Sequence, residues 1–184
     1  MDKQYDGTAY ICTVGSDFEI GPCRDSIAGL VRRQGDAPPV YGRGTKGYEG
    51  RQQHINKFLD GPHDFIFMMD SDQTFPANSL ERLRSHKLPF VSGFYMRRSH
   101  TAIAPVWFKP WSGKWPLEPW TDPLEPGRLY EIGASGWGCT LMHRDVVLAV
   151  RELLKGEGDV LEDDMDVWPY DLAVIMEAIR GLRA

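Results

Sequence analysis

Residues 64–72 read DFIFMMDSD, an apolar run that ends in two aspartates one residue apart. A continuous run of this length, unlike an alternating one, is typical of a strand buried on both faces of a sheet. We therefore predict a central strand at 64–69. Asp70 and Asp72 then follow its carboxyl end, at the edge where open α/β sheets bind ligands.

Strands and helices alternate on both sides of this run. From the spacing of apolar residues and the turn residues between them, we expect strands at 8–14, 40–41, 89–95, 129–132 and 139–143, and helices at 21–33, 51–59, from 78 onward, 145–154 and 169–182. This alternation predicts a mostly parallel, open α/β sheet.

Residues 107–130 differ in composition from the rest of the chain, with four tryptophans and five prolines. A solvated linker seldom carries so many large rings, so we predict an ordered aromatic insertion or a lid. Packing is the expected role of Trp111 and Trp115. Trp137 lies between two glycines, which favours a contact with a ligand.

Length and composition limit the class of protein. The 184 residues suffice for one well-packed domain and are short for two. A hydrophobic content of 42% with 26% charged residues is that of an ordinary globular protein. The formal net charge of -5 argues against a dedicated nucleic-acid-binding protein, because such proteins need a basic surface.

Cysteine usage and hydropathy indicate the compartment. The three cysteines have no C-x-x-C spacing, which fits a reducing compartment and no zinc cluster. The first residues lack the apolar stretch of a signal peptide, and no apolar run approaches the roughly 18–20 residues of a membrane span. We expect a cytoplasmic protein without a transmembrane segment.

The acidic pair suggests a metal site. Two carboxylates this close repel each other unless a cation lies between them. Mg²⁺ and Mn²⁺ prefer carboxylate oxygens and can bridge them to the phosphates of a substrate. The alternative is an aspartate that caps a helix or stabilises a polar turn without any ligand.

The sequence around Asp70-Ser71-Asp72 resembles the nucleotide-sugar-dependent glycosyltransferases of the GT-A fold, family-2-like. The similarity rests on the apolar strand that ends in D-x-D, on the Phe75-Pro76 turn, and on segments 51–59, 89–98 and 136–146. It implies a three-layer, Rossmann-like fold in one domain over 1–184. The donor nucleotide half would be 8–75, and the acceptor half 89–184 would include the aromatic insertion.

The resemblance also implies roles for individual residues. Asp72 would ligate the Mn²⁺ or Mg²⁺ that holds the diphosphate of a UDP- or GDP-type sugar donor, and Asp70 would contact the ribose, or the metal through water. The strand end at Thr13 and Gly15 would border the base. Further contacts would come from Arg51 and Ser71 on the donor side and from Gly136, Trp137 and Gly138 on the acceptor side. The acceptor, whether glycan, lipid or protein, is not specified.

Inverting members of this family need a carboxylate base for the acceptor hydroxyl. The matching position is Asp171, with Tyr170 in place of the usual glutamate; a carboxylate there also suits the helix dipole, with or without catalysis. The acidic residues 163, 164 and 166 are alternative bases. Family members usually continue into a strand and a histidine that completes the metal site, so we expect either a metal with fewer protein ligands or a C-terminally shortened chain. His143 is expected to be structural.

Two other functions fit the same residues. In a haloacid-dehalogenase-like phosphatase, Asp70 would be the nucleophile and Asp72 the acid/base, with Asp163 and Asp164 as the later metal pair; a supporting lysine motif is missing. A non-catalytic protein that binds a nucleotide sugar or a glycan is the third interpretation.

Overall fold

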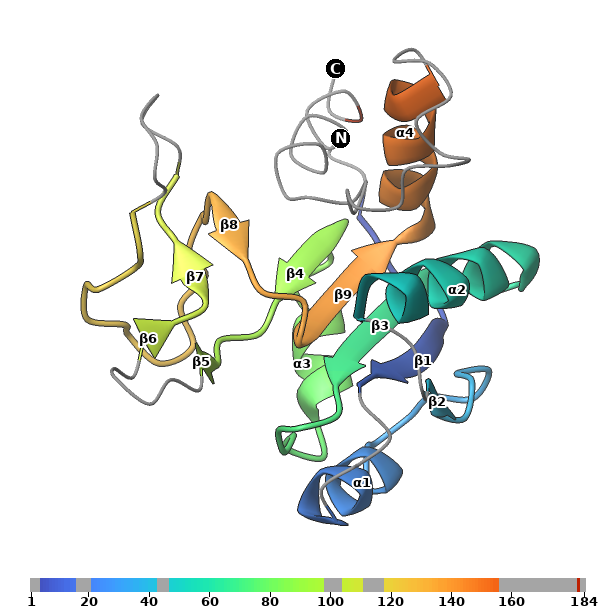
Figure 1. Ribbon diagram of the computed structural model, residues 1–184, viewed down its shortest axis with the longest axis horizontal. Coiled ribbons are helices and arrows are strands. Elements are labelled where there is room, and N and C mark those ends of the chain that lie inside the picture. The colour runs from blue at the N-terminus through green and yellow to red at the C-terminus, as the bar shows by residue number, and fades with distance from the viewer. Residues whose placement is uncertain are drawn as a thin grey trace.

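The computed structural model describes residues 4–15, 21–42, 47–97, 104–110, 118–155 and 182. A five-stranded sheet forms its centre (Figure 1). The sheet contains β1 (Ala9–Val14), β2 (Val40–Tyr41), β3 (Phe65–Asp70), β4 (Phe90–Ser92) and β9 (Cys139–His143), in the order β2-β1-β3-β9-β4. The two halves expected from the sequence therefore share one sheet.

The sheet is mostly parallel, as predicted. β1 pairs in parallel with β2 and β3, whereas β9 pairs antiparallel with both β3 and β4. Four strands thus share one direction, and β9 opposes them. The reversal has a simple cause: the chain leaves the sheet after β4 and returns into β9 at the same edge, because Ser92 pairs with Thr140.

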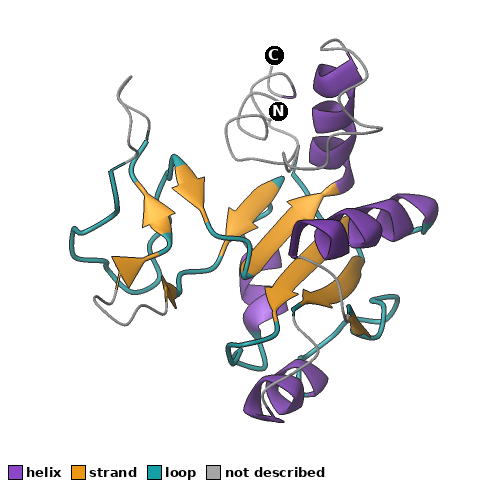
Figure 2. Ribbon diagram, viewed as in Figure 1, coloured by secondary structure: helices purple, strands orange, loops and turns teal. Residues whose placement is uncertain are grey.

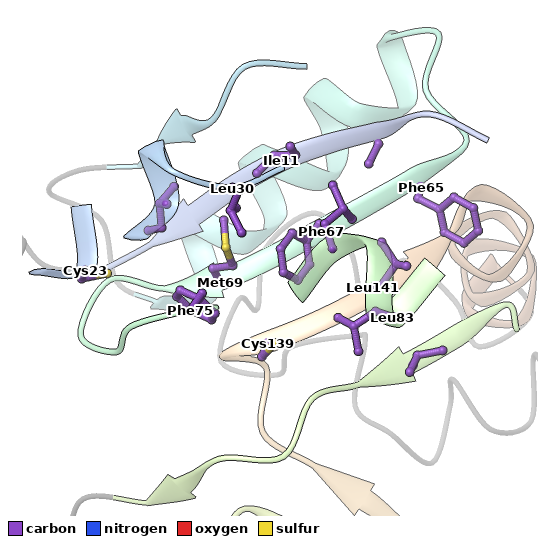
Figure 3. Packing of buried hydrophobic residues seen from close by; sticks show 14 of the residues in the cluster. Ile11, Cys23, Leu30, Phe65, Phe67, Met69, Phe75, Leu83, Cys139 and Leu141 are labelled. Carbon is purple, nitrogen blue, oxygen red and sulfur yellow. The ribbon is translucent and has the colours of Figure 1, made fainter. Parts of the chain in front are cut away.

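The structure has three layers, a central sheet with helices on each face (Figure 2). A hydrophobic cluster lies between the sheet and the helices on either face. Side chains of β3 alternate between the two clusters: Phe65, Phe67 and Met69 face one side, and Ile66 and Met68 the other. Helices α1 (Gly21–Ala28) and α3 (Ser79–Arg84) pack on the first side, which Figure 3 shows, and α2 (Gly47–Asp60) and α4 (Arg144–Lys155) on the second. Within the described ranges, no helix has the length and apolar character that a membrane crossing requires.

Four short strands form a lobe beside the main sheet (Figure 1). They are β5 (Met96–Arg97), β6 (Ala104–Pro105), β7 (Trp107–Phe108) and β8 (Ala134–Ser135), which pair as β5-β6 and β7-β8. Trp107 is buried, and Trp120 makes an edge-to-face contact with Tyr130. Trp107 and Trp120 are therefore packed, whereas most residues from 118 to 130 are exposed. Trp111 and Trp115 lie outside the described residues.

Two expected elements differ from the structure, and a third cannot be compared with it. The strand predicted at 129–132 is wrong: the strand forms at 134–135 instead, where the backbone pairs with Trp107 and Phe108. The helix predicted at 21–33 ends at Ala28, since the amide of Val31 donates to the Ala77 carbonyl (2.7 Å) rather than to its own helix. The helix predicted at 169–182 lies outside the described residues except for residue 182.

Candidate functional site

The acidic pair lies at the carboxyl end of β3. Asp70 is the last residue of that strand and pairs with Val14, the last residue of β1. The amide of Ser71 donates to the Val14 carbonyl (3.2 Å), so the two strand ends stay together where the turn begins. The alternation along β3 places Asp70 on the same face as Ile66 and Met68, which is the face that α2 covers.

Helix α2 supplies the counter-ion of Asp70. Arg51 Nη2 donates to Asp70 Oδ1 at 2.8 Å, with side-chain exposures of only 20% and 28%. Burial raises the pKa of Asp70; the guanidinium of Arg51 opposes this rise, and the neighbouring Asp72 adds to it. The strand end therefore holds a carboxylate whose charge Arg51 offsets in part.

Asp72 is placed differently from Asp70. It is exposed and lines an open pocket of about 400 Å³. The other described residues that line this pocket are Cys23, Gln73, Thr74, Tyr95 and Met96. Two aspartates one residue apart thus divide into one that Arg51 holds and one that a ligand in the pocket can reach.

Gly138, at the entry to β9, packs directly on this site. Its carbonyl accepts hydrogen bonds from the Asp70 amide (3.1 Å) and from Gln73 Nε2 (2.8 Å), and its amide donates to Tyr95 Oη (2.8 Å). A Cβ at this position would lie 2.2 Å from Gln73 Nε2 and 2.6 Å from Asp70 Oδ2. Only glycine permits this approach. Gly136 is equally confined, since a Cβ at this position would lie 2.1 Å from Tyr95 Oη.

Three donor-side residues expected from the sequence lie close to Asp70. A Cβ at Gly15 would lie 1.6 Å from Ser71 Oγ, so the turn after β1 touches the turn after β3. Ser71 and Thr13 are buried. The Thr13 carbonyl accepts from the Gly42 amide (3.0 Å) and lies 3.2 Å from His54 Nε2. In this structure Thr13 and Ser71 shape the strand ends and present no exposed hydroxyl.

The expected acceptor-side and base residues have mixed positions. Trp137 is partly buried, packs against the cluster of α2 and α4, and makes an edge-to-face contact with Phe90. Asp171, the expected base, lies outside the described residues, as do its alternatives at 163, 164 and 166.

The acidic pair has no third candidate metal ligand among the described residues. Within the described ranges, no group of three or more His, Cys, Asp or Glu side chains could hold a metal ion. His143 is at the other end of the sheet, since it pairs with Phe65 at the start of β3. Its Nδ1 accepts from the Asp145 amide (3.1 Å), and its ring packs against Tyr5 and Phe65, as expected of a structural histidine.

Tyr95 and Gln73 belong to the site although their own sequence neighbourhoods do not predict it. Both residues come from segments distant from Gly138, so their meeting depends on the whole fold. The spacing of Gly136 and Gly138 was the available signal, because paired glycines beside a strand indicate that something approaches the backbone closely.

Comparisons with known proteins bear on the fold. No protein-family model and no curated protein matches this chain. Among solved structures, the crystal structure titled "Crystal Structure of A197 from STIV" is similar, with a TM-score of 0.54 and 14% sequence identity, covering 93% of this chain and 77% of that chain. At this identity the likeness supports the three-layer α/β fold alone.

Proposed function

We propose that this chain is a metal-dependent glycosyltransferase of the GT-A type, which moves a sugar from a UDP- or GDP-type donor to a hydroxyl group of an acceptor. The observation that carries the proposal is the divided acidic pair at the carboxyl end of β3. Asp70 is held by Arg51 at 2.8 Å, and Asp72 is exposed at a pocket. A site of this form suits a ligand that brings its own phosphates to a cation.

The two carboxylates fit Mn²⁺ or Mg²⁺. Magnesium is often bound through one or two carboxylates, with water and substrate phosphates as the other ligands. Asp72 would therefore be the direct ligand, and Asp70 would act through water, because one of its oxygens is occupied by Arg51. A bound ion supplies positive charge to the departing nucleoside diphosphate.

The protein's own groups then handle the acceptor. A carboxylate, with Asp171 as the candidate, takes the proton of the acceptor hydroxyl. The acceptor oxygen bonds to the anomeric carbon while the bond from that carbon to the phosphate oxygen breaks. Attack from the face opposite the leaving group inverts the anomeric centre.

Thermal stability with Mn²⁺ and UDP, GDP, dTDP or CDP tests this proposal. We expect at least one metal–nucleotide pair to raise the melting temperature of the wild type and to leave Asp72→Asn unchanged. Asp60→Asn is the matched control. Asp60 is also an exposed aspartate, but it lies at the end of α2, before the start of β3, whereas Asp72 follows the end of β3. A wild type that responds to none of the pairs contradicts the proposal.

The other two interpretations give different results in the same samples. A phosphatase would use Asp70 as its nucleophile. The Asp70 carboxylate is partly buried and paired with Arg51, and both features disfavour that role. Hydrolysis of an aryl phosphate that disappears in Asp70→Asn would establish it. Stabilisation by nucleotide sugars without transfer or hydrolysis would indicate a binding protein.

A further inference from the structure

One wall of the pocket beside Asp72 is organised by a single backbone position, Gly138. Its amide donates to Tyr95 Oη, and its carbonyl accepts from Gln73 Nε2, both at 2.8 Å. Both of these side chains also line the pocket. Side chains held by the backbone in this way are pre-organised to bind a ligand.

Each of the two side chains keeps hydrogen-bonding capacity beyond its bond to Gly138. The Tyr95 hydroxyl accepts the Gly138 amide, so its own proton can still be donated; Gln73 keeps its carbonyl oxygen Oε1 and a second amide hydrogen. In the described part of the chain, no recorded hydrogen bond uses these groups. Burial raises the pKa of Tyr95 to about 12, so the hydroxyl keeps its proton at neutral pH.

This set of groups favours a hydroxyl-bearing ligand over an anionic one. A sugar hydroxyl both accepts and donates, so it can accept from Tyr95 and donate to Gln73 Oε1 at the same time. A phosphate oxygen only accepts, so it would leave Gln73 Oε1 without a donor. The exposed apolar side chain of Met96 on the same pocket suits the C–H groups of a sugar ring.

We infer that Tyr95 and Gln73 form the subsite for the transferred sugar of the donor, where together they bind one of its hydroxyl groups. The inference rests on the proposed function, since the diphosphate must be held at Asp72 for the sugar to reach this wall. It adds two sugar-binding residues that the acidic pair alone does not indicate.

Isothermal titration calorimetry with Mn²⁺ present measures how much the sugar part of the donor adds to the affinity of its nucleotide part. The probes are UDP against UDP-glucose, and GDP against GDP-mannose. We expect the wild type to bind one nucleotide sugar about tenfold more tightly than its nucleoside diphosphate, which corresponds to one well-placed hydrogen-bonded hydroxyl. Tyr95→Phe should remove this gain and leave the affinity for the nucleoside diphosphate within about twofold.

Two further variants keep the test decisive. Tyr130→Phe is the matched control, because the Tyr130 hydroxyl also accepts a backbone amide, that of Glu125 at 2.8 Å, and lies in the lobe. Gln73→Leu should reproduce Tyr95→Phe, and it serves alone if Tyr95→Phe fails to fold. An unchanged gain in Tyr95→Phe and Gln73→Leu, or an equal loss of affinity for nucleotide and nucleotide sugar in them, overturns the inference. So does a wild type that binds the nucleotide without any gain from the sugar. A wild type that binds no nucleotide overturns the proposed function, and the inference with it.

Discussion

Replacing Arg51 with methionine tests whether the Arg51–Asp70 ion pair is a buried support of the site. Methionine keeps most of the aliphatic stem and removes the charge. The structure then leaves the Asp70 carboxylate, only 28% exposed, next to Asp72 without its 2.8 Å donor. Arg51 Nε has no hydrogen-bond partner among the described residues, so the substitution removes a single charge-assisted hydrogen bond.

The expected loss follows from that bond. Hydrogen bonds to charged groups are worth about 1.5–3 kcal/mol, and the pair lies between the exposed and fully buried cases, so we expect a loss of about 2 kcal/mol. For a domain of this size this lowers the melting temperature by about 4–8 °C. The deficit should shrink as the pH falls, because Asp70, whose pKa burial raises, becomes protonated and no longer needs a counter-ion.

Differential scanning calorimetry at several pH values measures both effects. Arg128→Met is the matched control, since Arg128 pairs with Glu125 at 2.9 Å with exposures of 59% and 70%. Such a surface pair contributes little, and a drop of at most about 2 °C is expected. If Arg51→Met falls no further than Arg128→Met, or if its deficit is the same at every pH, the pair is solvated and our account of the strand end is wrong.

Three further changes have defined outcomes. Arg144→Lys should lower the free energy of unfolding by about 2–4 kcal/mol, because the guanidinium donates to four carbonyls at the end of α2, at 2.7–3.0 Å, and one ammonium cannot replace it. Gly138→Ala should destabilise by about 1–3 kcal/mol through overlap with Asp70 and should weaken metal–nucleotide binding. Burial lowers the pKa of His54, with Lys57 adding to this, so the wild type should lose stability as the pH falls below about 6.5, and His54→Gln should lack this loss.

Each of these changes has a control and a contrary result. Arg151→Lys removes a single exposed bond to Asn56 and should be nearly neutral; equal losses in the two arginine variants would contradict the capping role of Arg144. Gly21→Ala adds a methyl group with no atom within 4 Å, so its melting temperature should equal that of the wild type. A Gly138→Ala variant with the same melting temperature as Gly21→Ala would refute the close packing at Gly138. For His54, parallel pH profiles of wild type and variant in chemical denaturation would show that the histidine is not buried neutral.

The parts of the fold that the sequence predicts are those encoded locally. The apolar run and the two aspartates that follow it, Asp70 and Asp72, lie within nine residues. A strand that ends in carboxylates could therefore be expected without knowing which strands pair with it. The direction of β9 could not, because it depends on where the lobe returns the chain. Gln73 and Gly138 are 65 positions apart, and nothing in either neighbourhood indicates that they bond.

The site shows the same division between local and long-range information. Arg51 was expected near the donor from a resemblance, whereas its ion pair with Asp70 follows from the alternation of β3 and the placement of α2. Trp137 was expected to contact a ligand because glycines flank it. In the structure those glycines make room for Tyr95 and Gln73, and the indole packs against the helix face.

The central proposal is that Asp72 binds a divalent ion together with the phosphates of a nucleoside diphosphate. Electron paramagnetic resonance of Mn²⁺ measures this against a protein-free sample of Mn²⁺ and the same nucleotide, because the signal of the free hexaaqua ion decreases when the ion binds to either the nucleotide or the protein. We predict about one bound Mn²⁺ per chain in the presence of UDP or GDP, and none in Asp72→Asn under the same conditions. A signal that falls no further with the protein than in the protein-free sample for every nucleoside diphosphate, or that falls equally with wild type and Asp72→Asn, would contradict the proposal.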